Sequence, residues 1–565
     1  MILDKNMRYR ILLFLLVVFQ ATFSQSVNIT LYDRGNNAPL PFANLCFEEI
    51  TTGKKYYRTS SENGIADNPI ENRALIAISF VGYKTITDTV QPGVSKTYLM
   101  EQDLFNMEQV VVTGTRTPKR LADVPVQTTV ITEADIQKAG AVSPMEILQD
   151  NIPGLVSSSN AMGNNMRIRG LNSRYILFLV DGERLVSEGA GGNINLDQID
   201  FNTVERIEVV NGAASALYGS NAVGAVINII TKKPVHRFEG GISTSLQSHN
   251  TNKAQLNFGS NLAKTTLSAS IFRNRTDGYD LPEGAMSKPH TDYGTDMKIS
   301  YKPSPNVSID LNNRLFQHEL FNFPESMNAV HRLERKVTLG GNTSVSSANA
   351  RNNLSASINF DKFYKYDVME RKDDQLEKQN DITYISSRMV NTYSSEERWE
   401  AVAGIEYNYE EISTDSSKIL GPDPAVKRVG DGNIFAQYQY SFIEGFEGIL
   451  GGRFTYNEQF GTALSPKLSL MFKTGKFVLR GGIGTAFRAP SLQELFYNFN
   501  HNGSFWVYGN PNLIPEKGLY NSLSVEYTRG SLNASLSGYL NQIRDKITSY
   551  RVISLWDSPT GIIPM

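Results

Sequence analysis

The chain has 565 residues, with 55 Lys and Arg side chains against 57 Asp and Glu and a single cysteine. This length exceeds one ordinary globular domain, so we expect either several domains or one very large barrel. The balanced charge argues against a nucleic-acid partner. One cysteine, Cys46, excludes a disulfide framework and a Cys-based zinc site.

The N-terminus has the pattern of an export signal. In "MRYRILLFLLVVFQATFSQS", Arg8 and Arg10 precede an apolar run over residues 11–19, and small residues follow. The run is shorter than the roughly 20 residues that a membrane-spanning helix needs. We therefore predict a signal peptide over residues 1–24, with the mature chain beginning near Gln25.

Residues 25–100 alternate between strand-like runs and turn signals, which predicts a small β-sandwich. The stretches "SENGIADN" and "ISFVGYKT" resemble the carboxypeptidase regulatory-like domain found ahead of exported receptors. The segment has no histidine, so the resemblance implies no catalytic zinc site.

The next motif, "EQVVVTG", begins at Glu108. Its β-branched residues suit an ordinary sandwich strand. They also suit a free strand that pairs with the sheet edge of another protein.

Residues 115–235 have the pattern of one α+β unit. "SPMEILQDNIPG" predicts a helix that Ser143 caps and Pro144 begins. The strand candidates are "NMRIRG", "YILFLVDGERL" and "VERIEVVNG", followed by "AASALYGSNAVGAVINIITKKP". Arg167 and Arg169 are placed on one strand face, where they either pair with Glu205 or Glu208 or lie in solvent.

From His236 onward apolar and polar residues alternate with period two, as in "KTTLSASIF" and "NSLSVEYTRGSLNASLSGYL". The connections alternate as well. They are short near residues 261, 304, 394, 474 and 529, and long over residues 277–288, 321–327, 368–373, 413–427 and 488–515. Short turns at one end and long loops at the other are typical of an outer-membrane β-barrel.

A compact unit followed by such a barrel resembles the TonB-dependent receptors of Gram-negative outer membranes. The motifs that carry the resemblance are "EQVVVTG", "IPGL", "RIRG", "LVDGERL", "VERIEVVNGAASALYG", "FRAPSLQELF" and "GNPNLIPE". The resemblance implies a TonB box over residues 107–114, a plug over 115–235 and a 22-stranded barrel in outer-membrane lipid from 236 to 565. It also implies that the TonB complex binds Glu108, Gln109, Val110, Val111, Val112 and Thr113.

Only about fifteen barrel strands can be counted, whereas single-chain bacterial barrels have an even number. The sequence ends in "DSPTGIIPM", which has no terminal aromatic strand. We therefore expect the barrel to be C-terminally incomplete, as a fragment or a truncated product.

The stretch between "FRAP" and "NPNL" suggests a ligand. It contains His501 among aromatic residues, and in haem and haemoglobin receptors of the family a histidine between these motifs is an axial ligand. Imidazole suits haem iron, and flat aromatic side chains suit the macrocycle. The resemblance thus assigns His501 to the metal, with Tyr497, Trp506 and Tyr508 as candidates for the flat surface; the alternative is a solvated loop histidine. Such receptors also place a ligand on the plug, but this chain has no histidine between residues 101 and 235, and Met162 is the candidate substitute there.

The sequence therefore predicts a mainly β transporter that imports a scarce metal chelate and needs no cofactor of its own. Haem is the first candidate ligand, with haemoglobin or a surface haem-binding lipoprotein as partners, and a ferric siderophore or cobalamin is the alternative. A surface docking protein that transports nothing is a further possibility. No residue constellation indicates an enzyme.

Overall fold

The computed structural model describes residues 28–34, 37–80, 83, 85–101, 110–139, 144–160, 163–186, 194–212, 214–220, 222–280, 286–287, 289–322, 332–349, 351–369, 377–395, 398–414, 419, 425–501, 505–529, 532–552 and 561–564. The chain divides into two compact units. One comprises residues 1–110 with 120–122, and the other comprises residues 111–119 with 123–565. Among the described residues, no helix is long and apolar enough to cross a membrane.

The first unit contains two small sheets around one apolar core. One sheet has the order β4-β1-β7 and the other the order β3-β2-β5-β6. The strands are β1 (Asn28–Asp33), β2 (Asn44–Glu49), β3 (Lys55–Thr59), β4 (Ile65–Asp67), β5 (Ala74–Ser79), β6 (Ile86–Val90) and β7 (Lys96–Met100). Alternate residues such as Leu31, Phe47 and Ile76 fill the core because successive side chains of a strand point to opposite faces.

The second unit begins with an α+β domain, called the plug here (residues 123–231). Its five-stranded sheet has the order β10-β16-β17-β14-β15, and β11, β12 and β13 form a second sheet. The strands are β10 (Thr128–Thr132), β11 (Leu155–Asn160), β12 (Gly163–Ile168), β13 (Leu171–Asn172), β14 (Ile176–Val180), β15 (Glu183–Arg184), β16 (Val204–Asn211) and β17 (Ala225–Thr231). The helices are α2 (Glu133–Ala139), α3 (Pro144–Asn151), α4 (Ser215–Tyr218) and the 3₁₀ turns η2 (Ser173–Tyr175), η4 (Leu196–Gln198) and η5 (Phe201–Thr203).

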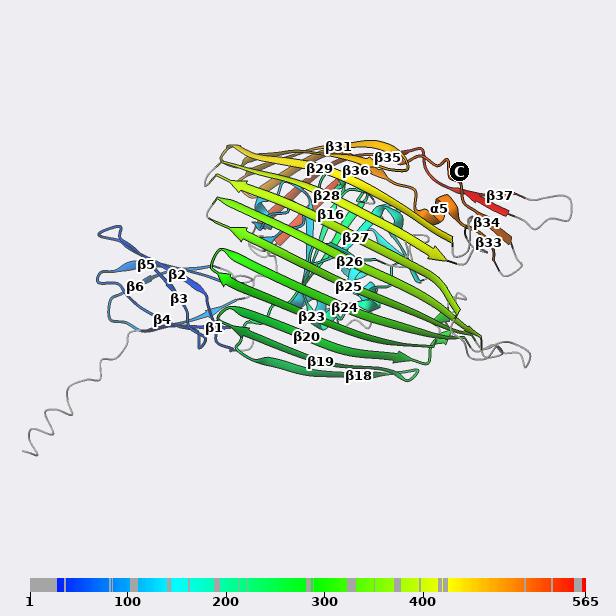
Figure 1. Cartoon of the computed structure of the whole chain (residues 1–565). Coiled ribbons are helices and arrows are strands. Elements are labelled where there is room, and N and C mark those ends of the chain that lie inside the picture. Colours follow the sequence, from blue (N-terminus) through cyan, green and yellow to red (C-terminus); the bar gives the residue numbers. More distant parts are fainter. Residues whose placement is uncertain are drawn as a thin grey trace, which may run out of the picture. The chain divides into compact units, whose positions relative to one another are not determined.

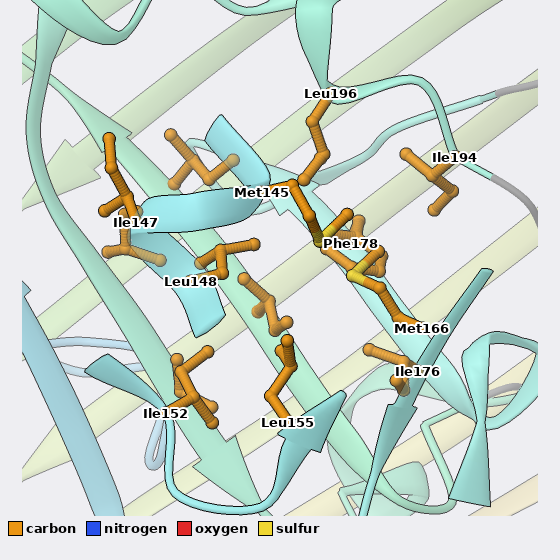
Figure 2. Close-up of a cluster of buried hydrophobic side chains, with 14 of the residues drawn as sticks. Met145, Ile147, Leu148, Ile152, Leu155, Met166, Ile176, Phe178, Ile194 and Leu196 are labelled. Carbon is orange, nitrogen blue, oxygen red and sulfur yellow. The ribbon is translucent and has the colours of Figure 1, made fainter. Parts of the chain in front are cut away.

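The plug has its own hydrophobic core, in which α3 packs against the sheets. Figure 2 shows Met145 and Leu148 of the helix beside Met166, Ile176 and Phe178 of the strands. The predicted helix begins at Pro144 as expected, and its predicted cap, Ser143, lies outside the described residues. The plug therefore has a core of its own, while other plug residues, such as Leu217 and Val223, are buried against residues of the large sheet.

Fifteen antiparallel strands form one large sheet in the order of the sequence (Figure 1). They are β18 (Glu239–Gln247), β19 (Thr251–Leu262), β20 (Thr265–Thr276), β23 (His290–Ser304), β24 (Val307–Asn322), β25 (Arg332–Ala348), β26 (Asn352–Met369), β27 (Glu377–Ser394), β28 (Trp399–Thr414), β29 (Ala425–Ile443), β30 (Phe446–Asn457), β31 (Gly461–Thr474), β32 (Phe477–Arg488), β35 (Glu516–Arg529) and β36 (Leu532–Arg544). Because neighbours in the sequence pair, all five predicted short connections lie at one end and all five predicted long loops at the other.

The polarity of the large sheet is the reverse of that of a water-soluble sheet. In β31, Leu464, Leu468 and Leu470 are exposed, whereas Ser465 and Lys467 on the opposite face are buried. The same holds for Ile271 and Ser270 of β20. Apolar residues that point away from the plug while polar residues point toward it are the pattern of a membrane barrel, so the predicted mainly β fold class is confirmed.

The short elements at the long-loop end are β21 (Tyr279–Asp280) with β22 (Met286–Ser287), α5 (Leu492–Phe496), and a four-stranded sheet of β33 (Asn498–His501), β34 (Phe505–Tyr508), β37 (Ser549–Val552) and β38 (Gly561–Pro564). An aromatic row lies toward the other end, near the short turns. It contains Tyr393, Trp399, Tyr438, Tyr440, Phe442, Phe446 and Phe472, whose neighbouring rings lie 5.0–6.3 Å apart. Such rows are typical of membrane interfaces.

The small residues around Tyr218 are explained by close contact with the large sheet. Gly212 has a φ of +102°, and a Cβ there would lie 2.3 Å from the ring of Tyr520. Gly219 has a φ of +78°, and a Cβ there would lie 3.1 Å from the guanidinium of Arg453. Glycine is therefore required at both positions, for its backbone conformation and for its size.

Candidate functional site

The first candidate site is the segment predicted to bind TonB. Glu108 and Gln109 lie outside the described residues. Val110 and Val111 form β8 (Val110–Val111), which pairs with β9 (Lys119–Arg120). Val112 and Thr113 follow without regular structure.

Glu208 of β16 holds the C-terminal end of this segment. Its Oε2 accepts hydrogen bonds from the backbone N–H groups of Val112 (2.9 Å) and Thr113 (2.8 Å) and from the Thr113 hydroxyl (2.6 Å). Its Oε1 accepts one from Arg206 Nε (2.9 Å). The Glu208 side chain is completely buried, so these bonds supply the partners that a buried carboxylate requires.

Two further plug residues contact Thr113. Asn228 lies opposite Glu208 in the β16–β17 pair and donates from Nδ2 to the Thr113 hydroxyl at 2.9 Å. The Tyr218 hydroxyl donates to the Thr113 carbonyl at 3.0 Å. These contacts were not predicted, although a Glu and an Asn in the middle of two apolar strands were a signal of a buried polar site.

Residues after Thr113 form a hydrogen bond and an ion pair with the large sheet. Thr117 Oγ1 donates to Glu400 at 2.7 Å, and Lys119 Nζ lies 3.0 Å from the same carboxylate. Arg116 donates to the Leu217 carbonyl at 2.6 Å and lies over the rings of Tyr218 and Phe435. Burial lowers the pKa of Arg116 to about 10, so it remains cationic at neutral pH.

The second candidate site is a charged cavity between the plug, α5 and strands that include β27 to β30 and β32. Ion pairs cross it. Arg388 of β27 contacts Glu183 of β15 at 2.5 Å, and Arg174 of η2 contacts Glu494 of α5 at 3.3 Å. The cavity thus has both signs of charge, and its cations and anions largely neutralise each other.

The motifs "FRAPSLQELF" and "GNPNLIPE" meet at one arginine beside this cavity. Arg488 donates to Glu494 at 2.9 Å and to Glu516 at 2.8 Å. Ser491 and Glu494 form a capping box that begins α5. Burial alone would raise the pKa of Glu494, but Arg488 and the Ser491 backbone lower it on balance, so α5 is held by an ionised carboxylate.

The predicted haem residues lie in the loop that follows α5. Tyr497 ends α5, His501 is the last residue of β33 and pairs with Phe505, and Trp506 and Tyr508 lie on β34. The rings of Trp506 and Tyr508 are stacked at 6.0 Å with an interplanar angle of 13°. Met162 lies outside the described residues. Within the described part of the chain, no three His, Cys, Asp or Glu side chains converge on a metal position.

The predicted pairing of Arg167 or Arg169 with Glu205 or Glu208 is wrong. Arg169 follows β12 with a φ of +52°, in a turn that removes it from the strand face. Its guanidinium contacts the Tyr520 hydroxyl at 3.2 Å and the ring of Tyr539 instead. Both glutamates pair with Arg206.

Comparison with known families identifies the class of protein. The family described as TonB dependent receptor-like, beta-barrel matches residues 243–560, and the TonB-dependent receptor plug domain matches residues 120–226. The first match alone covers more than half of the chain. The chain therefore belongs to the TonB-dependent receptor family, and it is an outer-membrane protein of a Gram-negative bacterium. Members of this family interact with TonB, and the family is one of receptors and transporters, not of enzymes.

Curated relatives are about a quarter identical to the chain over the aligned residues. The iron-regulated outer membrane virulence protein of Vibrio cholerae is 25% identical over 78% of this chain and 69% of its own length. The vitamin B12 transporter BtuB of Vibrio vulnificus is 24% identical over 81% and 74%.

Solved structures share the fold. The siderophore receptor PirA from Pseudomonas aeruginosa has a TM-score of 0.63 and 20% identity, covering 77% of this chain and 78% of its own. The ferric enterobactin receptor PfeA from Pseudomonas aeruginosa has a TM-score of 0.64 and 18% identity, covering 75% and 73%.

Proposed function

We propose that the chain actively imports a scarce metal chelate, with the TonB complex pulling on residues 108–113. The observation that carries the proposal is the attachment of Val112 and Thr113 to Glu208. A partner strand that pairs with Val110 and Val111 would apply force next to this attachment. The force would reach β16, which is hydrogen-bonded between β10 and β17 inside the plug.

Haem is the ligand that this chain's own residues favour. His501 offers an imidazole, and the stacked rings of Trp506 and Tyr508 on the neighbouring strand offer flat apolar surface. Haemoglobin or a surface haem-binding lipoprotein would be the source. The second candidate is a ferric siderophore, as in the names of the solved receptors PirA and PfeA, or cobalamin, as in the name of the vitamin B12 transporter.

Replacing Val111 by Pro tests the coupling. Proline removes the backbone donor and breaks strand pairing, so uptake should stop while surface binding continues. Val111→Ala, which keeps the backbone donor and adds no polar group to this buried position, is the matched control and should import normally. Undiminished uptake by Val111→Pro would mean that TonB does not act through this segment.

A haem titration tests the ligand. Wild-type protein should give a red-shifted Soret band, and His501→Ala should lose it while keeping its heat-resistant fold. His249→Ala removes a histidine from the turn after β18, at the same end of the sheet, and should leave the band unchanged. If ferric enterobactin or cyanocobalamin binds and haem does not, the second candidate replaces the first and the transport mechanism stands.

A further inference from the structure

A polar cavity lies between the plug and the large sheet, away from the two sites described above. It is lined by residues of β31, β32 and β35 and by plug residues that include Gln127 and Asn211. The alignment of the three strands explains why this space is hollow. Gly482 of β32 lies between Ser469 of β31 and Ser522 of β35. Two residues further along β32, Gly484 lies between Lys467 and Tyr520.

The hollow exists because β32 has no side chain at its centre. A Cβ on Gly482 would lie 3.1 Å from the Ser522 hydroxyl and 3.7 Å from the Ser469 hydroxyl. Both hydroxyl groups therefore face the same empty space above Gly482. Hydroxyls can donate hydrogen bonds to whatever occupies it.

The charge of the cavity is not balanced. Its charged lining residues are Lys467 and Arg480, and no acidic side chain is among the described residues that line it. Arg480 is neutralised by Glu526 at 2.8 Å and also donates to the Val124 carbonyl. Lys467 is only 7% exposed and has no ion-pair partner in the part of the chain that the structure describes.

A buried ammonium group without a counter-charge is unfavourable. The Asn211 Oδ1 atom, which is buried without a hydrogen-bond partner, can accept a proton donor but cannot neutralise a charge. We propose that this cavity binds one small monovalent inorganic anion of the size of chloride. Lys467 supplies the charge, and Ser469 and Ser522 supply hydroxyl donors.

The anion would lie between plug and sheet, so it should stabilise the folded receptor. The experiment compares thermal unfolding in chloride with unfolding in gluconate, an anion too large for the hollow, at equal ionic strength. Wild-type protein in detergent should unfold several degrees higher in chloride, with a saturable dependence on its concentration. Bromide soaked into crystals should give an anomalous peak beside Lys467.

Two variants test separately the contribution of the positive charge and that of the empty space. Lys467→Met removes the charge, and Gly482→Ala fills the hollow while keeping every charge; both should lose the chloride effect and the bromide peak. Gly452→Ala is the matched control, since this glycine lies on the outer face of β30, does not line the cavity and has room for a Cβ with no atom within 4 Å. No difference between the two salts for wild type, or a chloride effect that survives in Gly482→Ala, would overturn the proposal.

Discussion

Glu208 is a charged side chain with no exposed surface, and its position explains how a short peptide segment is kept on the plug. Four hydrogen bonds satisfy its two oxygens, and three of them come from Val112 and Thr113. Hydrogen bonds to charged groups contribute about 1.5–3 kcal/mol each, which is more than neutral ones do. A single residue therefore supplies most of the polar attachment of the segment.

Glu208→Gln should release the segment without unfolding the plug. The amide loses the negative charge and turns one acceptor into a donor, so docking should weaken by about 2 kcal/mol, or roughly 30-fold. A spin label on Cys at position 110, in a Cys46→Ser background, should show a larger mobile fraction. Glu205→Gln is the control because Glu205 pairs with Arg206, not with the segment, among the described residues and is half exposed. Equal mobility in the two variants would assign the attachment to other contacts.

Glu49 makes the first unit sensitive to acid. Hydrogen bonds from Thr52, Glu71 N–H and Asn72, which outweigh the effect of burial, lower its pKa from 4.5 to about 2. A lowered folded-state pKa gives stability that is complete above pH 4.5 and is lost as the pH falls toward 2. Hydrogen exchange of β2 and β5, corrected for intrinsic rates, should therefore accelerate in this window for wild type and depend less on pH in Glu49→Gln. Glu48→Gln, on the exposed face of the same strand, should keep the wild-type profile.

At the scale of elements, the turn before α4 depends on a glycine that no other residue can replace. Gly212→Ala adds a Cβ that would overlap the Tyr520 ring and also strains a positive φ. We expect a loss of several kcal/mol in plug stability, read as faster proteolysis of the plug. Gly170→Ala also has a positive φ, of +80°, but meets no atom within 4 Å, so it should cost only about 1 kcal/mol. Equal effects would mean that backbone strain, not the contact with Tyr520, fixes the glycine.

The strands of the large sheet could be predicted because alternation with period two is local and is repeated along three hundred residues. The turn alternation follows from the same local pattern. The short strands β3, β4 and β7 of the first unit are harder to predict because each has at most five residues and a mixed polar composition. Arg169 was misplaced because a positive φ at a non-glycine residue leaves no clear mark in the sequence.

The site was less predictable than the fold because its partners are far apart in the sequence. Thr113 and Glu208 are separated by 95 residues, and Arg488 and Glu516 by 28. Motif resemblance identified the segments, but it did not say which side chains within them meet. Which side chains meet is decided only in the folded protein, because each of these two pairs depends on how the strands of a different sheet are aligned.

At the scale of the molecule, the alternation of connections predicts which parts can be reached from outside the cell. An epitope tag at Gly421, between β28 and β29, should bind antibody on intact cells. A tag at Gly475, between β31 and β32, should bind only after permeabilisation. A Cβ on Gly475 would meet no atom within 4 Å, so there is open space beside this residue. The opposite result would reverse the orientation and place His501 on the periplasmic side.

The reversed polarity of the large sheet also bears on how easily its contents can be displaced. Where the plug meets the sheet, many of the contacts are ion pairs and hydrogen bonds, such as Arg388 with Glu183 and Gln127 with Ser537, beside smaller apolar contacts such as Leu217 with Phe435. Water can replace polar partners one at a time, whereas a wholly apolar interface of equal area would have to separate as a unit. We therefore expect modest mechanical work to open the polar part of this interface in small steps.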